Sequence, residues 1–399
     1  MRIAHCFAKQ IFDTRGNPTI ETTLQTATIS AIASIPSGKS TGKHEAMELR
    51  GSDGDVNQAI ENVNGEIARA LTDRDFDSAD EIDTLLIELD RTPDKSRLGA
   101  NAILSVSIAA QRLFALSDGV PLWSAIAHRA GTTPGAPRLF VNMMNGGAHA
   151  DFKLPFQEYL LVVEGKTSAA LPLATEAFAK LGERLRAEEP DVPMGDEGGY
   201  APTFPILEQP FGILADLVKE FPNTSIAIDA AASELFHDGA YHLLGKSYSA
   251  DELASIYGGI TEKYPMHSIE DPFTEDAHED FAALTAALGK KILIIGDDLT
   301  VTNAARIKET AERKEINAVI IKPNQVGTVK EAIQAVQATY AAGFAAVASH
   351  RSGETDDTFI ADFAYGIGAH GLKAGGLGQR ERMLKYERLL AIEREAETV

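Results

Sequence analysis

The sequence predicts an α/β protein in which an N-terminal α+β domain, residues 1–126, caps a C-terminal (β/α)8-like barrel, residues 137–399. In the second half of the chain, short apolar runs alternate with stretches of helical composition, an order typical of parallel sheets covered by helices. The first 125 residues instead place strand-like segments before helix-like ones. A stretch of small residues and proline, 127–138, is the best candidate for a linker between the two parts.

Composition narrows the classes of function. The chain has 399 residues, of which 44% are hydrophobic and 24% charged, and its formal net charge is −21. Because no basic stretch stands out, we do not expect nucleic acid as a partner. No apolar run reaches membrane-spanning length, so we expect no membrane partner. Cys6 is the single cysteine and excludes an intrachain disulfide, in agreement with the cytoplasmic location that we expect.

The elements of the first part follow in order. Residues 11–38 are predicted to form strands, with a turn at Gly16, Asn17 and Pro18. Residues 56–72, 79–91 and 99–119 have the pattern of helices. Strands followed by helices indicate a separate α+β domain.

The elements of the second part repeat. Its predicted strands lie in the runs 225–233, 264–273, 291–300, 317–325, 345–353 and 370–376. Its predicted helices lie at 250–264, 279–291, 302–315, 329–343 and 355–368. The strand runs are almost continuously apolar, which indicates a sheet covered on both faces.

An ionisable residue closes each of these strand runs. The closing residues are Asp229, Glu270, Asp297, Lys322, His350 and Lys373. In a (β/α) barrel the carboxyl ends of all strands surround one mouth, so these six side chains would converge on one cavity. An open doubly wound sheet would spread them along an edge instead, and we therefore favour the barrel.

The closing residues also predict a chemistry. Asp229, Glu270 and Asp297 would form an oxygen-rich site for a hard divalent ion, and Mg²⁺ suits it. No spacing rich in histidine or cysteine points to zinc. Lys322, close to a metal and to another cation, would have its pKa lowered enough to act as a base. An acidic protein that binds an anionic ligand needs such local cations.

The segment 34–46 contains Gly38-Lys39-Ser40-Thr41, which resembles the end of a nucleotide-binding P-loop. That motif requires a glycine five residues before the Gly-Lys pair, where this chain has Ala33. Pro36 interrupts the approach, and Gly42 makes a helix start unfavourable. The segment is therefore not predicted to be a P-loop.

Several ordered blocks resemble the enolases, the phosphopyruvate hydratases of glycolysis. The resemblance covers about residues 3–395, and its blocks include "IFDTRGNPTIE", "PSGKSTGKHEAMELR", "LGANAILSVS", "NMMNGGAHAD", "FQEYL", "GDEGGYAP", "SIEDPF", "GDDLTVTN", "KPNQVGT" and "SHRSGETDDTFIAD". It implies an enolase-type barrel whose first strands are not all parallel. It also implies a Mg²⁺-dependent lyase that removes the proton α to the carboxylate of 2-phosphoglycerate and forms phosphoenolpyruvate, acting as a homodimer or higher homo-oligomer.

The resemblance assigns metal ligands and acid–base groups. Asp229, Glu270 and Asp297 match the ligands of one Mg²⁺, and Ser40 matches the ligand of a second, on a loop that closes over the site. A base and an acid are implied as well, together with a carboxylate beside the acid. Lys322 matches the base, Glu197 matches the acid, and Glu158 matches the carboxylate beside the acid.

The resemblance also assigns substrate contacts. His149 matches a substrate-contacting histidine, and Lys373 matches the lysine at the substrate carboxylate. His350, Arg351 and Ser352 match the run that binds the phosphate.

Among several departures from the family pattern, two lie closest to the expected chemistry. Lys39 stands where the family has a small residue, and the turn after Lys373 reads "AGGLGQRER" rather than "TGAP" followed by "RSER". An added lysine would suit a substrate with one more anionic group, so a relative such as the carboxyphosphonoenolpyruvate synthases is the alternative. An enolase-derived binding protein without catalysis is a third hypothesis, against which the intact ligands and acid–base residues argue.

Overall fold

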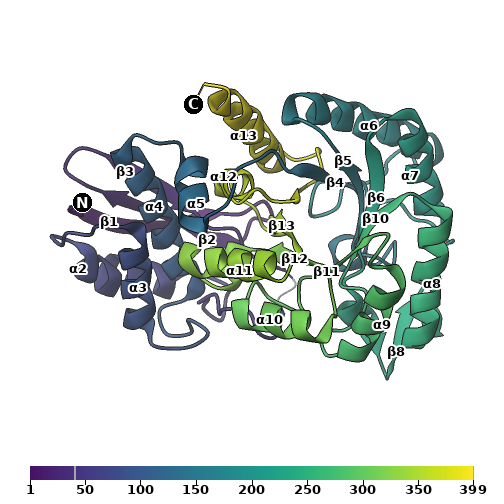
Figure 1. Cartoon of the computed structure of the whole chain (residues 1–399), viewed down its shortest axis with the longest axis horizontal. Coiled ribbons are helices and arrows are strands. Elements are labelled where there is room, and N and C mark those ends of the chain that lie inside the picture. Colours follow the sequence, from purple (N-terminus) through teal and green to yellow (C-terminus); the bar gives the residue numbers. More distant parts are fainter. Residues whose placement is uncertain (40–41, 399) are drawn as a thin grey trace.

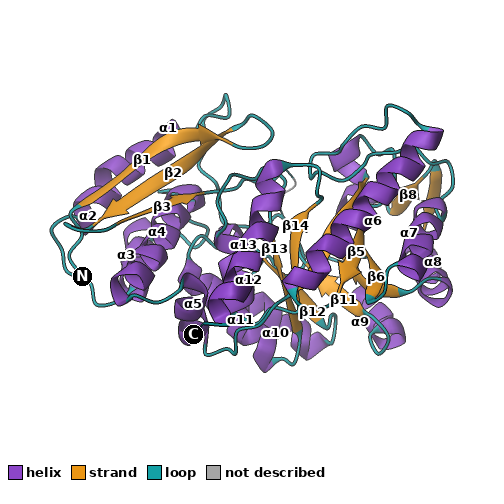
Figure 2. Ribbon diagram, turned by 90° about the horizontal axis from the view of Figure 1, so that it is seen from above, coloured by secondary structure: helices purple, strands orange, loops and turns teal. Residues whose placement is uncertain are grey.

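The computed structural model describes residues 1–39 and 42–398 (Figure 1). Within the first 39 residues, strands β1 (His5–Phe12), β2 (Pro18–Gln25) and β3 (Ser30–Ser34) form an antiparallel sheet in sequential order. The predicted turn at Gly16 connects β1 to β2, and Gly16 adopts a φ of +76° that favours glycine. Figure 2 shows this sheet and its helices beside the barrel.

Five α-helices and one π-helical turn complete this part. They are α1 (Asn57–Asn62), η1 (Val63–Ile67), α2 (Ala68–Leu71), α3 (Ala79–Asp90), α4 (Ala100–Asp118) and α5 (Leu122–Ala130), counted over the described residues. The predicted helix over 56–72 is present without a gap from Asn57 to Leu71, but its middle is a π-helical turn rather than α-helix. There the Asn64 side chain accepts a hydrogen bond from the Ala8 N–H (2.6 Å) and donates to the Ala8 carbonyl (3.0 Å), and the backbone forms a π-turn at this docking point on β1.

Helix α4 is the core of the N-terminal part. It packs against β2 and β3, and most of its side chains are buried. It is long and apolar enough to span a membrane by length and composition, which the sequence reading missed, but 83% of the apolar window is buried inside the protein. Helix α5 extends to Ala130, so the first four residues of the predicted linker 127–138 are helical.

Eight strands of the described chain close into a barrel, which confirms the predicted architecture. Their order around the barrel is β10 (Met266–Glu270), β11 (Leu293–Gly296), β12 (Ala318–Ile321), β13 (Ala345–Ser349), β14 (Gly371–Gly375), β4 (Arg138–Asn145), β5 (Glu158–Val163) and β6 (Thr224–Asp229). Strand β5 is antiparallel to β4 and β6, while the remaining neighbours are parallel. The expectation that the first strands are not all parallel is therefore correct.

Helices surround the barrel, as Figures 1 and 2 show. They are α6 (Thr167–Glu188), α7 (Gln209–Glu220), α8 (Ala250–Lys263), α9 (His278–Leu288), α10 (Ala304–Arg313), α11 (Val329–Ala341), α12 (Phe359–Gly366) and α13 (Arg380–Ala396). Short 3-10 turns occur at η2 (Gly147–Ala150), η3 (Ala232–Leu235) and η4 (Pro323–Gln325). A small sheet of β7 (Phe236–His237), β8 (Ala240–Leu243) and β9 (Lys246–Tyr248), which was not predicted, precedes α8.

The barrel interior is layered because alternate residues of a strand point to the same face. A central apolar layer packs inside the strands and consists of Phe140, Leu160, Val162, Ala227, Ile295, Ala318, Ile320 and Val347. On several of these strands, the residue two positions closer to the mouth points to the same face and has a polar side chain. They include Asn142, Glu158, Asp229, Asp297, Lys322 and Ser349. Strand periodicity thus places the candidate site directly on an apolar support.

A polar cluster lies at the opposite end of the barrel. His267 on β10 and His370, which precedes β14, approach within 2.9 Å through their Nε2 atoms. Arg138 at the start of β4 donates to Nδ1 of His370 (3.3 Å) and bonds to Glu164 (2.6 Å). We call these four residues the floor cluster.

The N-terminal part reaches the barrel mouth through the segment that follows β3. Ser37 and Gly353 exchange two backbone hydrogen bonds of 2.8 Å, and the Thr14 N–H donates to the Glu354 carbonyl (2.9 Å). Residues 36–39 consequently lie against the loop that follows β13.

Candidate active site

Three carboxylates stand level on neighbouring strands at the mouth. Glu158 pairs with Asp229 across β5 and β6, and Asp229 pairs with Glu270 across β6 and β10. Asp229 and Glu270 end their strands, whereas Glu158 begins β5. Because β5 runs antiparallel, its first residue reaches the same mouth as the last residues of its neighbours.

Lys373 extends from β14 into this row of carboxylates. Its ammonium lies 2.8 Å from Asp229 Oδ2 and 3.0 Å from both oxygens of Glu270, and it also contacts Glu158. Burial alone would lower the pKa of Lys373, but the surrounding carboxylates raise it well above its usual value. Burial, and next the charge of Asp229, raise the pKa of Glu270. Lys373 is thus a permanent positive charge in the site.

Lys322 forms a second ion pair across the mouth. Its ammonium bonds to Asp297, which follows β11, and Gln325 donates to the other Asp297 oxygen (2.9 Å). Burial would lower the pKa of Lys322, but the charge of Asp297 outweighs it and raises the pKa. The shift is therefore opposite to the expected lowering, because the ammonium of Lys322 contacts the carboxylate of Asp297 directly.

Glu197 lies on a tight loop that follows α6. Asn142 and Asn145 of β4 donate to its Oε2 at 3.2 and 3.4 Å. Burial would raise the pKa of Glu197, but the charge of His149 and the nearby cations Arg382 and Lys373 lower it to about 2. In this arrangement the carboxyl group is ionised.

The altered turn after Lys373 supports this loop. The Gly376 N–H donates to the Glu197 carbonyl (2.8 Å), and the Gly378 N–H donates to that of Gly198 (3.2 Å). A Cβ atom on Gly376 would lie 2.2 Å from the Gly198 oxygen. The turn therefore keeps a glycine where the two backbones meet.

His149 stands between the two acidic residues of the same loop. Its Nδ1 is 3.7 Å from Asp196 Oδ2 and its Nε2 is 3.6 Å from Glu197 Oε1. Burial would lower the pKa of His149, but the nearby carboxylates, first Glu197 and then Asp196, raise it. Lys39 bonds to Asp196 (2.7 Å) and to the Ala148 carbonyl (2.9 Å).

The run 350–352 closes the remaining side. Arg351 is held by Glu45 (2.8 Å) and by Asn324 (3.0 Å). Ser352 accepts a hydrogen bond from the Lys39 N–H through its Oγ (2.8 Å). His350 Nε2 lies 3.9 Å from Glu158 Oε1 and 3.9 Å from Glu197 Oε1. Ser40 lies outside the described residues, so its role stays a prediction.

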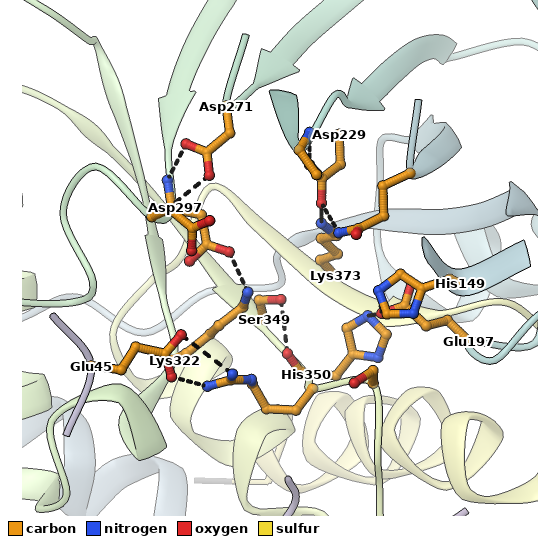
Figure 3. Close-up of a pocket in the computed structure, with 15 residues that line it drawn as sticks. Glu45, His149, Glu197, Asp229, Asp271, Asp297, Lys322, Ser349, His350 and Lys373 are labelled. Atoms are coloured by element: carbon orange, nitrogen blue, oxygen red, sulfur yellow. Dashed lines mark hydrogen bonds and ion pairs between the residues drawn. The ribbon is translucent and has the colours of Figure 1, made fainter. Parts of the chain in front are cut away.

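These groups surround one pocket at the barrel mouth (Figure 3). It is lined by Glu45, His149, Gln157, Glu197, Asp229, Ala231, Asp271, Asp297, Asp298, Lys322, Ser349, His350, Arg351, Ser352 and Lys373. Glu158 and Glu270 do not line it, and both bond to Lys373, which does. In Figure 3, Lys322 and Glu197 stand on opposite sides of Lys373.

The donor set fits a hard cation, because it offers buried carboxylate oxygens in excess of nearby positive charge. Within the described residues, two groups bring ligand-type atoms within 4.8 Å of one another: Glu158 with Glu197 and His350, and Asp271 with Asp297 and Asp298. The three predicted ligands do not themselves form such a group, since Lys373 holds Asp229 and Glu270 while Lys322 holds Asp297.

Sequence reasoning missed the residues that hold the others in place. Asp271 accepts the backbone N–H groups of Asp297 and Asp298, both at 2.9 Å. Gln157 donates to Asp229 (3.2 Å), and Arg382 of α13 bonds to His350. Asp271 and Gln157 are sequence neighbours of predicted residues, which is a usable signal. Arg382 carries no such signal, because the fold alone brings it to the site.

Two family models match this chain. The enolase N-terminal domain matches residues 3–126, and the enolase C-terminal TIM barrel domain matches residues 135–398. An enolase from Anaplasma phagocytophilum (strain HZ) is 41% identical over 400 residues, which cover 97% of this chain and 93% of that relative. With the eight-stranded barrel and its polar mouth, these matches establish that the chain belongs to the enolase family.

Proposed function

We propose that this protein is a Mg²⁺-dependent lyase that dehydrates 2-phosphoglycerate to phosphoenolpyruvate. The observation that carries the proposal is the placement of Lys322 and Glu197 on opposite sides of one cavity, with the buried ammonium of Lys373 between them (Figure 3). Elimination of water from adjacent carbons needs a base on one side of the substrate and an acid on the other.

Lys322 is the proposed base, which takes the proton from the carbon next to the carboxylate. To do so it must first be neutral, and its ion pair with Asp297 opposes this while that carboxylate keeps its full charge. Lys373 stabilises the negative charge that develops on the substrate carboxylate, because its ammonium is buried and fixed before reaction.

Glu197 is the proposed acid for the departing hydroxide, and Glu158 its partner. Because the pKa of Glu197 is lowered, Glu197 must take up a proton when the substrate binds. A phosphate and a carboxylate placed beside it would raise that pKa by like-charge repulsion. We assign the phosphate to His350, Arg351 and Ser352, and a substrate contact to His149.

Asp229, Glu270 and Asp297 would hold one Mg²⁺, and we propose a second one with Ser40. When bound, Mg²⁺ supplies positive charge that stabilises the anionic form of the substrate carboxylate. The excess of buried carboxylates at the mouth supports this assignment.

No observation favours the phosphonate branch over 2-phosphoglycerate. Lys39, which suggested an extra anionic group on the substrate, is already paired with Asp196. A non-catalytic role is disfavoured, because each described group required for the elimination either lines the cavity or bonds to a residue that lines it. Ser40 lies outside the described residues.

We also propose that the protein is a cytoplasmic, glycolytic homodimer with residues 1–126 as a separate domain. Large apolar side chains are exposed on the N-terminal part, among them Phe7, Phe12, Ile32 and Leu116. A second copy would cover them, which light scattering after size exclusion would test by giving the mass of a dimer.

The decisive test is an assay of phosphoenolpyruvate formation from 2-phosphoglycerate. We expect turnover with Mg²⁺, none with EDTA, and recovery when Mg²⁺ is added in excess. Turnover of a phosphonate analogue without turnover of 2-phosphoglycerate would refute the proposal, and so would full activity in EDTA.

A further inference from the structure

Arg382 is a fully buried guanidinium next to the candidate site. It comes from α13, and it contacts His350 through Nδ1 of the imidazole. It also donates to the carbonyl oxygens of Arg351 (2.7 Å), Ser352 (2.7 Å) and Asp196 (3.3 Å). One side chain thus bonds to three consecutive residues of one segment and to the residue before Glu197.

The packing around Arg382 leaves little freedom. A Cβ atom on Gly375 would lie 2.7 Å from the Arg382 Cδ and 2.8 Å from the Glu197 carbonyl oxygen. The Nε of Arg382 donates to Gln379 (3.1 Å), so all three guanidinium nitrogens are engaged. A five-donor planar group in this position fixes the distance between the 350–352 run and the loop of Glu197.

The contact with His350 also determines where the imidazole carries its hydrogen. A guanidinium only donates, so Nδ1 of His350 must be the acceptor. Burial, followed by the charge of Arg382, lowers the pKa of His350 well below its usual value, so the ring is neutral. The hydrogen is then on Nε2, which faces Glu158 and Glu197.

We propose that Arg382 is a positioning residue that fixes His350 as the Nε2–H tautomer and sets the spacing between the phosphate-binding run and the acid loop. The expected effect of Arg382 on kcat rests on the proposed function. The assignment of the His350 tautomer does not. The Nε2–H of the neutral imidazole points toward Glu158 and Glu197, and the ammonium of Lys373 already contacts Glu158.

Nitrogen-15 NMR of histidine-labelled protein without Mg²⁺ tests the tautomer directly. His350→Gln identifies the signal by its loss. We expect wild type to show a neutral imidazole protonated at Nε2, and Arg382→Met to shift it to a mixture of tautomers or to the charged form. A wild-type His350 protonated at Nδ1 would overturn the proposal.

Lys385→Met is the matched control. Lys385 lies one turn further along α13, is equally buried, and bonds to Glu354 and the Thr355 carbonyl without touching His350. We expect it to leave the His350 tautomer as in wild type. The same change of tautomer in both variants would mean that Arg382 only stabilises the fold, and would reject the positioning role.

Kinetics test the second half of the proposal. We expect Arg382→Met to reduce kcat on the order of 10²-fold, because misplacement by about 1 Å costs that much, while KM changes far less. Arg382→Lys keeps a donor-only group, and should preserve the tautomer yet lose kcat, since one ammonium cannot span both segments. If Arg382→Met does not fold, Arg382→Lys carries the test, and wild-type kcat in that variant would refute the spacing role. The NMR result does not require turnover, so failure of the proposed function is recognised separately.

Discussion

The ammonium of Lys39 lies 2.7 Å from Oδ2 of Asp196, and the same carboxylate oxygen lies 3.7 Å from Nδ1 of His149. The lysine that departs from the family pattern is therefore tied to the loop of the proposed acid. It joins the segment after β3 to the opposite side of the mouth rather than remaining free for an extra substrate group.

Lys39→Ala should raise KM for 2-phosphoglycerate by no more than about 5-fold. Both partners are partly exposed, and such pairs contribute about 0.2–1 kcal/mol. Steady-state kinetics would measure this, with Lys43→Ala as control, whose ammonium bonds to Glu275 and Asp276 instead. A selective loss of phosphonate binding with unchanged KM for 2-phosphoglycerate would restore the substrate role first predicted for Lys39.

Lys322→Ala should abolish exchange of the substrate C2 proton with solvent, because no other proposed group serves as the base. Glu197→Gln should slow dehydration on the order of 10²–10⁴-fold but retain some exchange, since the acid acts after proton removal. Proton exchange followed by NMR in deuterated solvent separates the two steps. Wild-type exchange in Lys322→Ala would require another base.

Asp271→Ala should weaken Mg²⁺ binding by about 10–100-fold, the usual effect of losing a group that orients a metal ligand. The Asp271 carboxylate holds the backbone of Asp297 and Asp298 through two hydrogen bonds, and alanine removes both. Calorimetric titration with Mg²⁺ gives the dissociation constant. Asp276→Ala is the control, because this exposed residue of the same loop accepts from the Lys43 ammonium and not from the backbone of Asp297 or Asp298. Equal affinity in both variants would exclude an orienting role.

Acidification should destabilise the protein through the floor cluster. Burial, and next the charge of Arg138, lower the pKa of His267 and of His370 to about 4. Well above pH 6.5 both rings are neutral in the folded and unfolded chains and contribute no pH dependence. Between about pH 6.5 and 4 the unfolded chain binds the extra protons, so stability falls as pH falls, and below about 4 this loss levels off.

Urea unfolding at a series of pH values would measure this loss. We expect the pair to account for about 1–2 kcal/mol after allowance for partial exposure. His267→Gln/His370→Gln should flatten this part of the profile. His128→Gln, on the exposed face of α5, is the control and should leave the slope unchanged. A double variant with the wild-type slope would assign the acid sensitivity to other groups.

Strand periodicity explains why part of the site could be predicted from residues alone. Asp229, Glu270, Asp297, Lys322 and His350 end or directly follow parallel strands, so the rule that such ends meet at one mouth places them together. Lys373 lies inside β14, where it pairs with Ser349, the last residue of β13.

Other positions depend on tertiary structure that no local pattern reports. Glu158 begins a reversed strand, and Glu197 lies on a loop without regular structure, so only the resemblance pointed to them. Arg382 and Glu45 come from distant segments and act on His350 and Arg351 through the fold. The π-turn after α1 lies where Asn64 bonds to β1, and the helix propensities of the residues do not report this tertiary contact.

The reversal of β5 decides which connections are free to change. Because β5 descends, its exit at 164–166 leaves the barrel at the floor, whereas the connection from β4 to β5, residues 146–157, stays at the mouth. Gly165 is exposed, and a Cβ atom there would meet no neighbour within 4 Å, although its φ of +127° favours glycine. Engineers seeking an attachment point for surface immobilisation should therefore lengthen this exit while retaining Gly165, which keeps the substrate entrance turned away from the support.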